Sequence, residues 1–164
     1  MSNLEKVVGE DWYLILSDIL QSNEFKSILG WLRSQEKDGA EIIPNKRSLF
    51  NPFRTLKLRD VKCVIVGDEP FESVIDGKVV GPSSGRAFAV CSKHSASRMP
   101  SPHTNLIWEY ETYHDIGNFM LYHDTELDFM SDAGFLLLNA SLTKVVGKEF
   151  KHRRLWRPFI TKVL

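Results

Sequence analysis

Three carboxylates crowd one short loop of this chain, and they are the residues best placed to do chemistry. The loop contains Pro70, which stiffens it, and follows a mostly β-branched or apolar run at 61–66. That run predicts a buried strand, and Gly67 is expected to end it because glycine adopts backbone angles that other residues avoid. Open α/β sheets bind ligands at the carboxyl ends of their strands, so these residues indicate either a functional site or, equally, a solvated acidic turn. The carboxylates are Asp68, Glu69 and Glu72.

Length and charge indicate one domain, residues 1–164, with no global preference for a charged partner. The chain is 43% hydrophobic, and Lys+Arg and Asp+Glu number 21 each. The charge is uneven, however, because no Lys or Arg lies between Arg98 and Lys144, whereas residues 144–157 are basic. This basic stretch is the best electrostatic candidate for contacting phosphates, with a solvated helix start as the alternative. Its candidate phosphate-binding residues are Lys148, Arg153 and Arg154.

The two cysteines and the amino-terminal residues indicate the compartment. Cys63 and Cys91 fall in predicted strands and are expected to be small buried hydrophobes in a reducing environment. No segment resembles a secretory signal or is long enough to cross a bilayer, so no membrane partner is expected. A cytoplasmic location is expected, or a nuclear one if the source has a nucleus. No cofactor is expected, and the histidine spacings do not indicate a metal site.

Hydrophobic periodicity predicts helices and strands in alternation along the chain. Helical spacing is found at about 10–21, in the segment from 23 to the mid-thirties, at 104–113, near 125–132 and at about 153–163. Strands are predicted at 61–66, 87–91 and 134–139, and residues 73–86 and 92–103 are predicted to be loops. Strands separated by helices or long crossovers are typical of a parallel α/β sheet.

Several motifs, in this order, resemble those of the family 1 uracil-DNA glycosylases. That family has a strand ending in Gly-Gln-Asp-Pro-Tyr-His, which corresponds to residues 67–72 here, and its Gly-Leu-Xaa-Phe-Ser-Val corresponds to 85–90. Its Asn-Ile-Xaa-Xaa-Glu corresponds to 105–109, and its Gly-Val-Leu-Leu-Leu-Asn to 134–139. The Leu-Thr that follows is found at 142–143. The resemblance covers most of the chain.

The resemblance implies a role for each matching residue in a protein that flips a base out of DNA and cuts its glycosidic bond. Phe88 would stack on the flipped base, and Asn139 would hydrogen-bond its edge. Phe71 would take the place of the tyrosine that blocks a thymine methyl group. Glu69 would be the carboxylate that steadies the cationic sugar and orients water, and Ser101 would touch a phosphate.

The same loop departs from the family pattern in ways that oppose catalysis. Glu69 replaces an aspartate, Asp68 replaces a glutamine and Glu72 replaces a histidine. Displacing a catalytic group by about 1 Å costs roughly a hundredfold in rate. The extra charges oppose both an anionic leaving base and an anionic backbone. Glu69 and Asp68 remain the candidate catalytic residues.

The sequence ends before the family's last strand and its His-Pro-Ser-Pro-Leu-Ser motif. We therefore expect a three-layer α/β fold with a small parallel sheet of the uracil-DNA glycosylase type, lacking that strand and its loop. The strand at 134–139 is then expected at an exposed sheet edge, open to a protein partner or a self-dimer.

Three functions follow from the resemblance. The favoured one is a degenerate glycosylase that serves DNA repair or replication by binding uracil-containing or abasic DNA, or a protein. The alternative is an active glycosylase that hydrolyses the bond to uracil or a related base. Less favoured is cleavage at abasic sites, with the three loop carboxylates holding a divalent metal. The short chain and altered motifs also suggest a viral source.

Overall fold

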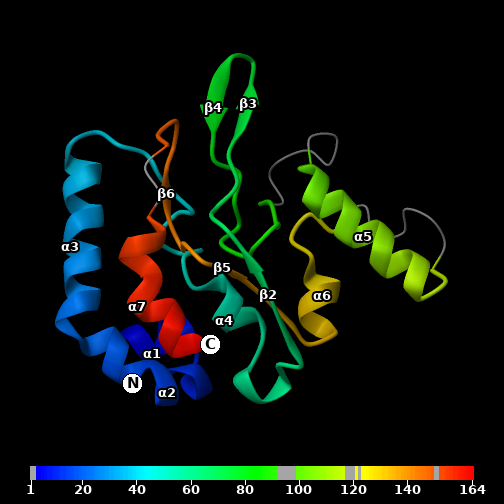
Figure 1. The fold of residues 1–164 in the computed structure, drawn as a ribbon, viewed down its shortest axis with the longest axis horizontal. Helices are drawn as coiled ribbons and strands as arrows, with labels where there is room; N and C mark the ends of the chain where they lie inside the picture. The colour runs from blue at the N-terminus through cyan, green and yellow to red at the C-terminus, as the bar shows by residue number, and fades with distance from the viewer. Residues whose placement is uncertain (1–2, 92–98, 117–120, 122, 150–151) are drawn as a thin grey trace.

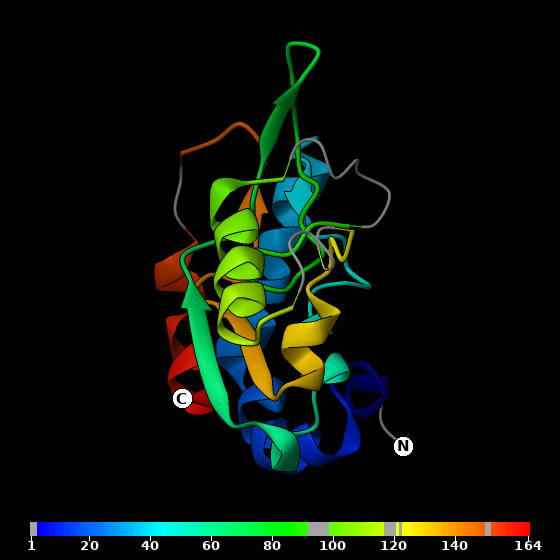
Figure 2. The ribbon, with the colours of Figure 1, turned by 90° about the vertical axis from the view of Figure 1, so that its right-hand side faces the viewer.

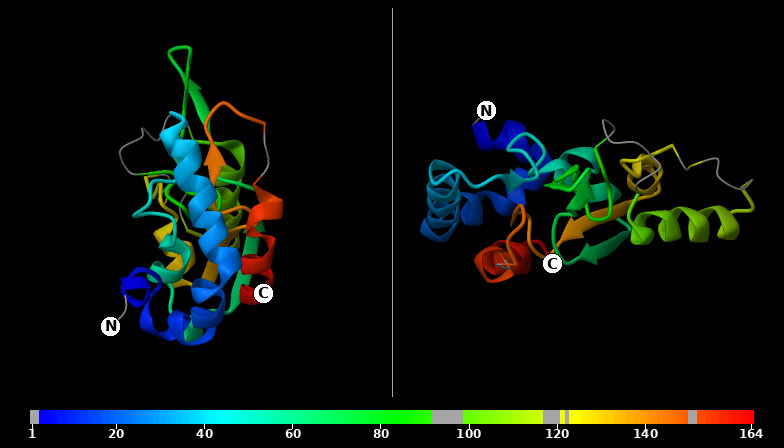
Figure 3. Two further views of the ribbon diagram at one scale, coloured as in Figure 1. Left: turned by 90° about the vertical axis from the view of Figure 1, so that its left-hand side faces the viewer. Right: turned by 90° about the horizontal axis from the view of Figure 1, so that it is seen from above.

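The computed structural model describes residues 3–91, 99–116, 121, 123–149 and 152–164, and they form three layers (Figure 1). Helices α1, α2, α3 and α7 lie on one side of strands β2 and β5, and α5 and α6 lie on the other. Figure 3 shows α3 crossing the outer face of the first helical layer. The helices are α1 (Asn3–Val8), α2 (Glu10–Gln21), α3 (Asn23–Lys37), α4 (Asn51–Thr55), α5 (Ser101–Tyr113), α6 (Asp128–Asp132) and α7 (Arg153–Val163), with a 3-10 turn at Leu58–Asp60. The strands are β1 (Ile42–Ile43), β2 (Cys63–Gly67), β3 (Ser73–Ile75), β4 (Lys78–Val80), β5 (Phe135–Asn139) and β6 (Lys144–Val145).

The predicted parallel sheet is confirmed, and it consists of β2 and β5 in the described residues. Their register runs from Cys63 opposite Phe135 to Gly67 opposite Asn139, so both strands end at the same level. Two antiparallel pairs were not predicted. Strand β1 pairs with β6, and β3 with β4 forms a hairpin that projects from the body at the top of Figure 1, inside the predicted loop 73–86.

Alternating side chains of β5 fill both cores. Leu136 and Leu138 pack with the helices of the first layer, and Leu137 packs with α5 and α6. Each of these leucines is at most 1% exposed, and burying such a side chain contributes about 1.5–3 kcal/mol. The core thereby fixes the carboxyl end of β5, where Asn139 lies.

The predicted strand at 87–91 is wrong. Its backbone makes an isolated bridge from Val90 to Ser83 and a hydrogen bond from the Ala87 amide to the Leu137 carbonyl (3.1 Å). Phe88 between them has a φ of 64°, which is left-handed and cannot continue a strand. The apolar alternation of this segment reflects burial against α5 and α6 rather than a strand.

Both strands of this sheet are edge strands in the described residues, but the exposed edge lies on β2 and not, as expected, on the strand at 134–139. All of β5 except Phe135 is buried, whereas β2 pairs only with β5 among the described residues and leaves Val64 and Val66 37% and 46% exposed. Figures 2 and 3 show β2 running along the outside of the molecule. The predictions that β2 is buried and that its Cys63 is buried are therefore wrong, and Cys91 is only partly buried.

No helix in the described part of the chain is both long and apolar enough to span a membrane.

Candidate functional site

A pocket of about 310 Å³ lies where β2 and β5 end. It brings together five of the predicted site residues from three separate stretches of the chain. These are Asp68 and Glu69 with Phe71 from the loop after β2, Phe88 from the turn, and Asn139 from the end of β5. The remaining lining comes from neighbours in the same loops, from Pro100 and Pro102 at the start of α5, and from Lys144 in β6.

Gly67 is required because of Asn139, not because of its backbone angles. A Cβ atom on Gly67 would lie 2.5 Å from Asn139 Oδ1 and 3.0 Å from the Ala87 Cβ, while its φ is not positive. The reason for Gly67 predicted from the sequence is therefore wrong. The close approach lets the Asn139 side chain reach the pocket across the end of β2.

The Asn139 amide is suited to recognise a ligand. The residue is only 2% exposed and lines the pocket, and its side chain makes no hydrogen bond among the described residues. The two polar atoms of the amide are not among the fully buried side-chain atoms that lack a partner, so they are open to the pocket. A primary amide presents one acceptor and two donors, which match the edge of a pyrimidine base.

Phe88 is held in its left-handed conformation by its neighbours on both sides. Its carbonyl accepts a 3.0 Å hydrogen bond from His103 Nδ1 on α5. Arg86, 2% exposed, forms ion pairs with Glu126 (3.1 Å) and Asp128 (2.8 Å). Such a backbone conformation costs of order 1–3 kcal/mol and persists only where the surroundings enforce it. No local pattern in the sequence indicates that His103 positions the aromatic side chain of the pocket.

Two buried histidines make stability depend on pH. Burial lowers the pKa of His103 below its ordinary 6.5, although the Phe88 carbonyl and Asp124 oppose this. Burial also lowers the pKa of His152, against the charge of Glu69. His152 is fully buried, lies 2.8 Å from Thr143 Oγ1 through its Nδ1 atom and contacts Trp31 edge-on.

We expect the free energy of unfolding to fall by about 1–2 kcal/mol as the pH drops from neutral through 6.5. The unfolded imidazoles bind protons in this range while the buried ones do not, so acid favours the unfolded chain. Urea unfolding at several pH values measures this. His103→Asn, which keeps a donor for Phe88, should flatten the dependence, and a stability that is flat over this range in the unchanged protein would contradict the account.

Lys144 joins two of the three loop carboxylates. Its ammonium lies 2.8 Å from Glu69 Oε1 and 3.0 Å from Glu72 Oε1, and the Gly147 amide donates to Glu72 Oε2 (3.0 Å). The Lys144 side chain is 13% exposed, and those of Glu69 and Glu72 are 21% and 26% exposed. The pocket loop is thereby tied to the turn after β6.

This arrangement favours the charged forms of Lys144 and Glu72. Burial alone would lower the pKa of Lys144, but hydrogen bonds and charges from Glu69 and Glu72 outweigh it and raise that pKa. Burial would likewise raise the pKa of Glu72, but the Gly147 amide and Lys144 lower it. The loop carboxylates do not form a group that can hold a metal ion in the described part of the chain, so the metal-dependent alternative is not supported.

The predicted phosphate contacts surround the pocket rather than line it. Ser101 is exposed at the first turn of α5, between two prolines of the pocket wall. Lys148 is exposed beside an adjoining hollow that includes Glu69. Arg153 lies 3.9 Å from the Asp68 carboxylate, and Arg153 and Arg154 line a groove with Val66 along the free edge of β2. Ser101, Lys148 and Arg153 are therefore each next to a residue of the pocket, whereas Arg154 is placed only in the groove beside β2.

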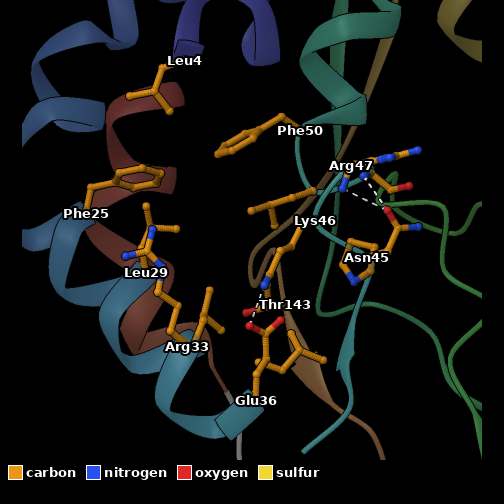
Figure 4. Close-up of a pocket in the computed structure, with 15 residues that line it drawn as sticks. Leu4, Phe25, Leu29, Arg33, Glu36, Asn45, Lys46, Arg47, Phe50 and Thr143 are labelled. Carbon is orange, nitrogen blue, oxygen red and sulfur yellow. Dashed lines mark hydrogen bonds and ion pairs between the residues drawn. The ribbon is translucent and has the colours of Figure 1, made fainter.

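A larger hollow lies elsewhere, between α3 and residues 42–50 (Figure 4). It measures about 960 Å³ and contains none of the predicted site residues. Thr143 lines it while the adjacent Lys144 lines the smaller pocket, so the two hollows lie on opposite sides of the chain at β6.

Comparison with solved structures identifies the class of fold. The crystal structure of mimivirus uracil-DNA glycosylase matches 99% of this chain and 57% of its own, with a TM-score of 0.80 at 20% identity. The fold is thus that of a uracil-DNA glycosylase, with three layers around a small parallel sheet.

Sequence comparison points the same way. The chain is 33% identical over 154 residues to the uracil-DNA glycosylase of Blochmanniella floridana and 30% identical over 154 residues to that of Escherichia coli. Each match covers 93% of this chain, which spans 65% and 62% of the length of those relatives. No protein-family model matches the chain. The chain therefore resembles the uracil-DNA glycosylases over nearly all of its residues.

Proposed function

We propose that this chain is a degenerate uracil-DNA glycosylase domain that binds DNA with an extruded base and does not cut its glycosidic bond efficiently. The observation that carries the proposal is the convergence of Phe88, Phe71 and the unpartnered Asn139 amide in one pocket at the ends of β2 and β5. An aromatic ring and an amide are what an unstacked pyrimidine needs, one for its face and one for its edge.

The ion pairs of the loop are the reason to expect little hydrolysis. Glu69, at the position implied for the catalytic carboxylate, is engaged by Lys144 at 2.8 Å. The negative charge of Glu69 is thereby directed at an ammonium group instead of a cationic sugar. Glu69 therefore stabilises the cationic transition state less than an unpaired carboxylate would. Asp68 and Glu72 add negative charge to the pocket entrance, where a leaving base would also be an anion.

Binding and base release separate this proposal from the alternative of an active glycosylase. We expect fluorescence anisotropy to show tighter binding to single-stranded DNA with one uracil than to the same strand with thymine, and mass spectrometry to show no free uracil. The alternative is favoured by the retained Glu69, Phe88 and Asn139. Free uracil at enzyme excess would establish it in place of the binding function.

The basic residues beside the pocket are proposed to hold the DNA backbone. Arg153→Glu with Arg154→Glu should weaken binding about tenfold or more and lower the slope of log affinity against log salt by about 1–2, because counterion release scales with phosphate contacts. Lys37→Glu with Arg59→Glu, exposed positions away from the pocket, is the matched control. Equal effects of the two pairs would favour the solvated-helix alternative for residues 144–157.

The free edge of β2 is proposed as the place of a protein contact, and a self-dimer is the simplest form of it. Unpaired backbone groups beside Val64 and Val66 suit strand pairing, and charged side chains prevent such pairing. We expect a concentration-dependent dimer by light scattering that Val64→Lys with Val66→Lys abolishes. Val74→Lys with Val79→Lys places the same charges on the exposed β3–β4 hairpin as a control. A chain that stays monomeric at every concentration would rule out the self-dimer.

A further inference from the structure

The 960 Å³ hollow beside α3 is an open groove with an apolar floor (Figure 4). Phe25, Leu32, Leu49 and Phe50 are buried beneath it, each at most 8% exposed. It shares no lining residue with the pocket at the ends of β2 and β5, so a ligand here need not disturb that pocket.

One wall of the groove is a continuous face of α3. Phe25, Leu29, Leu32, Arg33 and Glu36 follow helical spacing and all line the groove. From Phe25 to Glu36 this face extends about 16 Å along the helix axis, which is the length of about three helical turns. The opposite wall is the irregular segment 42–50, in which the Asn45 side chain accepts from the amides of Arg47 and Ser48 and fixes the turn.

Positive charge lies on both walls. Arg33 stands on the α3 wall, and Lys46 and Arg47 stand on the opposite one. The single carboxylate of the lining, Glu36, is already paired with Lys46 at 2.7 Å, as Figure 4 shows. Arg33 and Arg47 form no salt bridge among the described residues, so each wall keeps one uncompensated guanidinium group.

We propose that this groove binds an amphipathic helix of a partner protein that has an apolar stripe flanked on both sides by Asp or Glu. The stripe would cover the apolar floor, and the flanking carboxylates would meet Arg33 on one wall and Arg47 on the other. Duplex DNA fits poorly, because phosphates gain nothing from a floor of Phe and Leu side chains. The proposal does not depend on the activity of the other pocket.

The test uses a set of designed three-turn peptides with Leu and Phe at helical spacing and Glu on both flanks, and a matched set with Lys in place of Glu. Fluorescence anisotropy should show that the acidic peptides bind and that the basic ones do not, with weaker binding at high salt. Arg33→Glu with Arg47→Glu should weaken binding at least about tenfold, since two attractions become repulsions. Lys26→Glu with Lys57→Glu, exposed positions outside the groove, should leave it unchanged.

Three results would overturn the proposal. The first is equal binding of the acidic and basic peptides, and the second is no binding of any acidic peptide. The third is an equal loss of affinity for the acidic peptides in the Arg33/Arg47 and Lys26/Lys57 double variants. If uracil-free duplex DNA displaces the acidic peptides and the Arg33 and Arg47 changes weaken DNA binding equally, the groove is a DNA surface instead. Leu29→Gln tests the apolar lining separately and should weaken the binding of the acidic peptides without altering its salt dependence.

Discussion

Phe88→Ala should weaken binding to a uracil-containing single strand by about 5- to 150-fold, the range that one base–aromatic stack contributes. Phe88 lines the pocket together with Phe71 and the Asn139 amide, and its left-handed backbone accepts a hydrogen bond from the buried His103. The loss should be smaller on the same strand without uracil, because backbone contacts remain. Anisotropy titrations on both strands measure the two losses.

Two further variants distinguish loss of stacking from loss of structure. Phe88→Tyr retains a ring and should keep most of the affinity, while Tyr113→Ala removes a ring that is 85% exposed on α5 and should change nothing. Thermal unfolding shows whether the turn survives. An affinity loss in Phe88→Ala no greater than that in Tyr113→Ala, or equal on the two strands, would mean that Phe88 does not stack on a base.

Lys144→Met should lower the free energy of unfolding by about 1–3 kcal/mol and DNA affinity by about tenfold. Removing the Lys144 ammonium leaves Glu69 and Glu72 without their shared cation in a partly buried site. The expected cost in stability is lower than that of breaking a fully buried ion pair but higher than that of breaking a surface pair. Glu69 and Glu72 then face the phosphates without the cation that they share. Urea unfolding and anisotropy measure the two effects.

Lys46→Met provides the matched control for stability. Its ion pair with Glu36 is equally short at 2.7 Å, but Lys46 is 78% exposed, so its removal should cost at most about 1 kcal/mol. Lys144→Arg should preserve most of the stability. A double-mutant cycle of Lys144→Met with Glu69→Gln should show a coupling energy between the two residues. If Lys144→Met is as stable as Lys46→Met, the Lys144 ion pairs do not stabilise the fold.

The meeting of five predicted residues in one pocket was largely predictable, because they lie at the ends of elements with strong patterns. The strand leading to Asn139 is a run of leucines after a glycine, and the loop with Glu69 follows a β-branched run, so both strand ends were placed correctly. Helix α7 was likewise predicted with its observed bounds, because its apolar residues repeat at helical spacing.

What the sequence did not show are contacts between distant segments. Lys144 was seen only as part of a basic stretch, since nothing local indicates that it reaches back across more than seventy residues to Glu69. The same holds for the close approach of Asn139 to Gly67 and for the hydrogen bond from His103 to Phe88. The exposure of β2 was missed because a β-branched run looks the same on a free edge as in a sheet interior.

Base release at enzyme excess tests the central claim most directly, with Glu69→Gln and Asn139→Ala measured beside the unchanged protein. Binding to uracil DNA that Asn139→Ala weakens, with no free uracil from any variant, is the result expected of a binding domain. Free uracil from the unchanged protein that disappears in Glu69→Gln would contradict it and make the domain a working glycosylase, with Glu69 active despite its ion pair to Lys144.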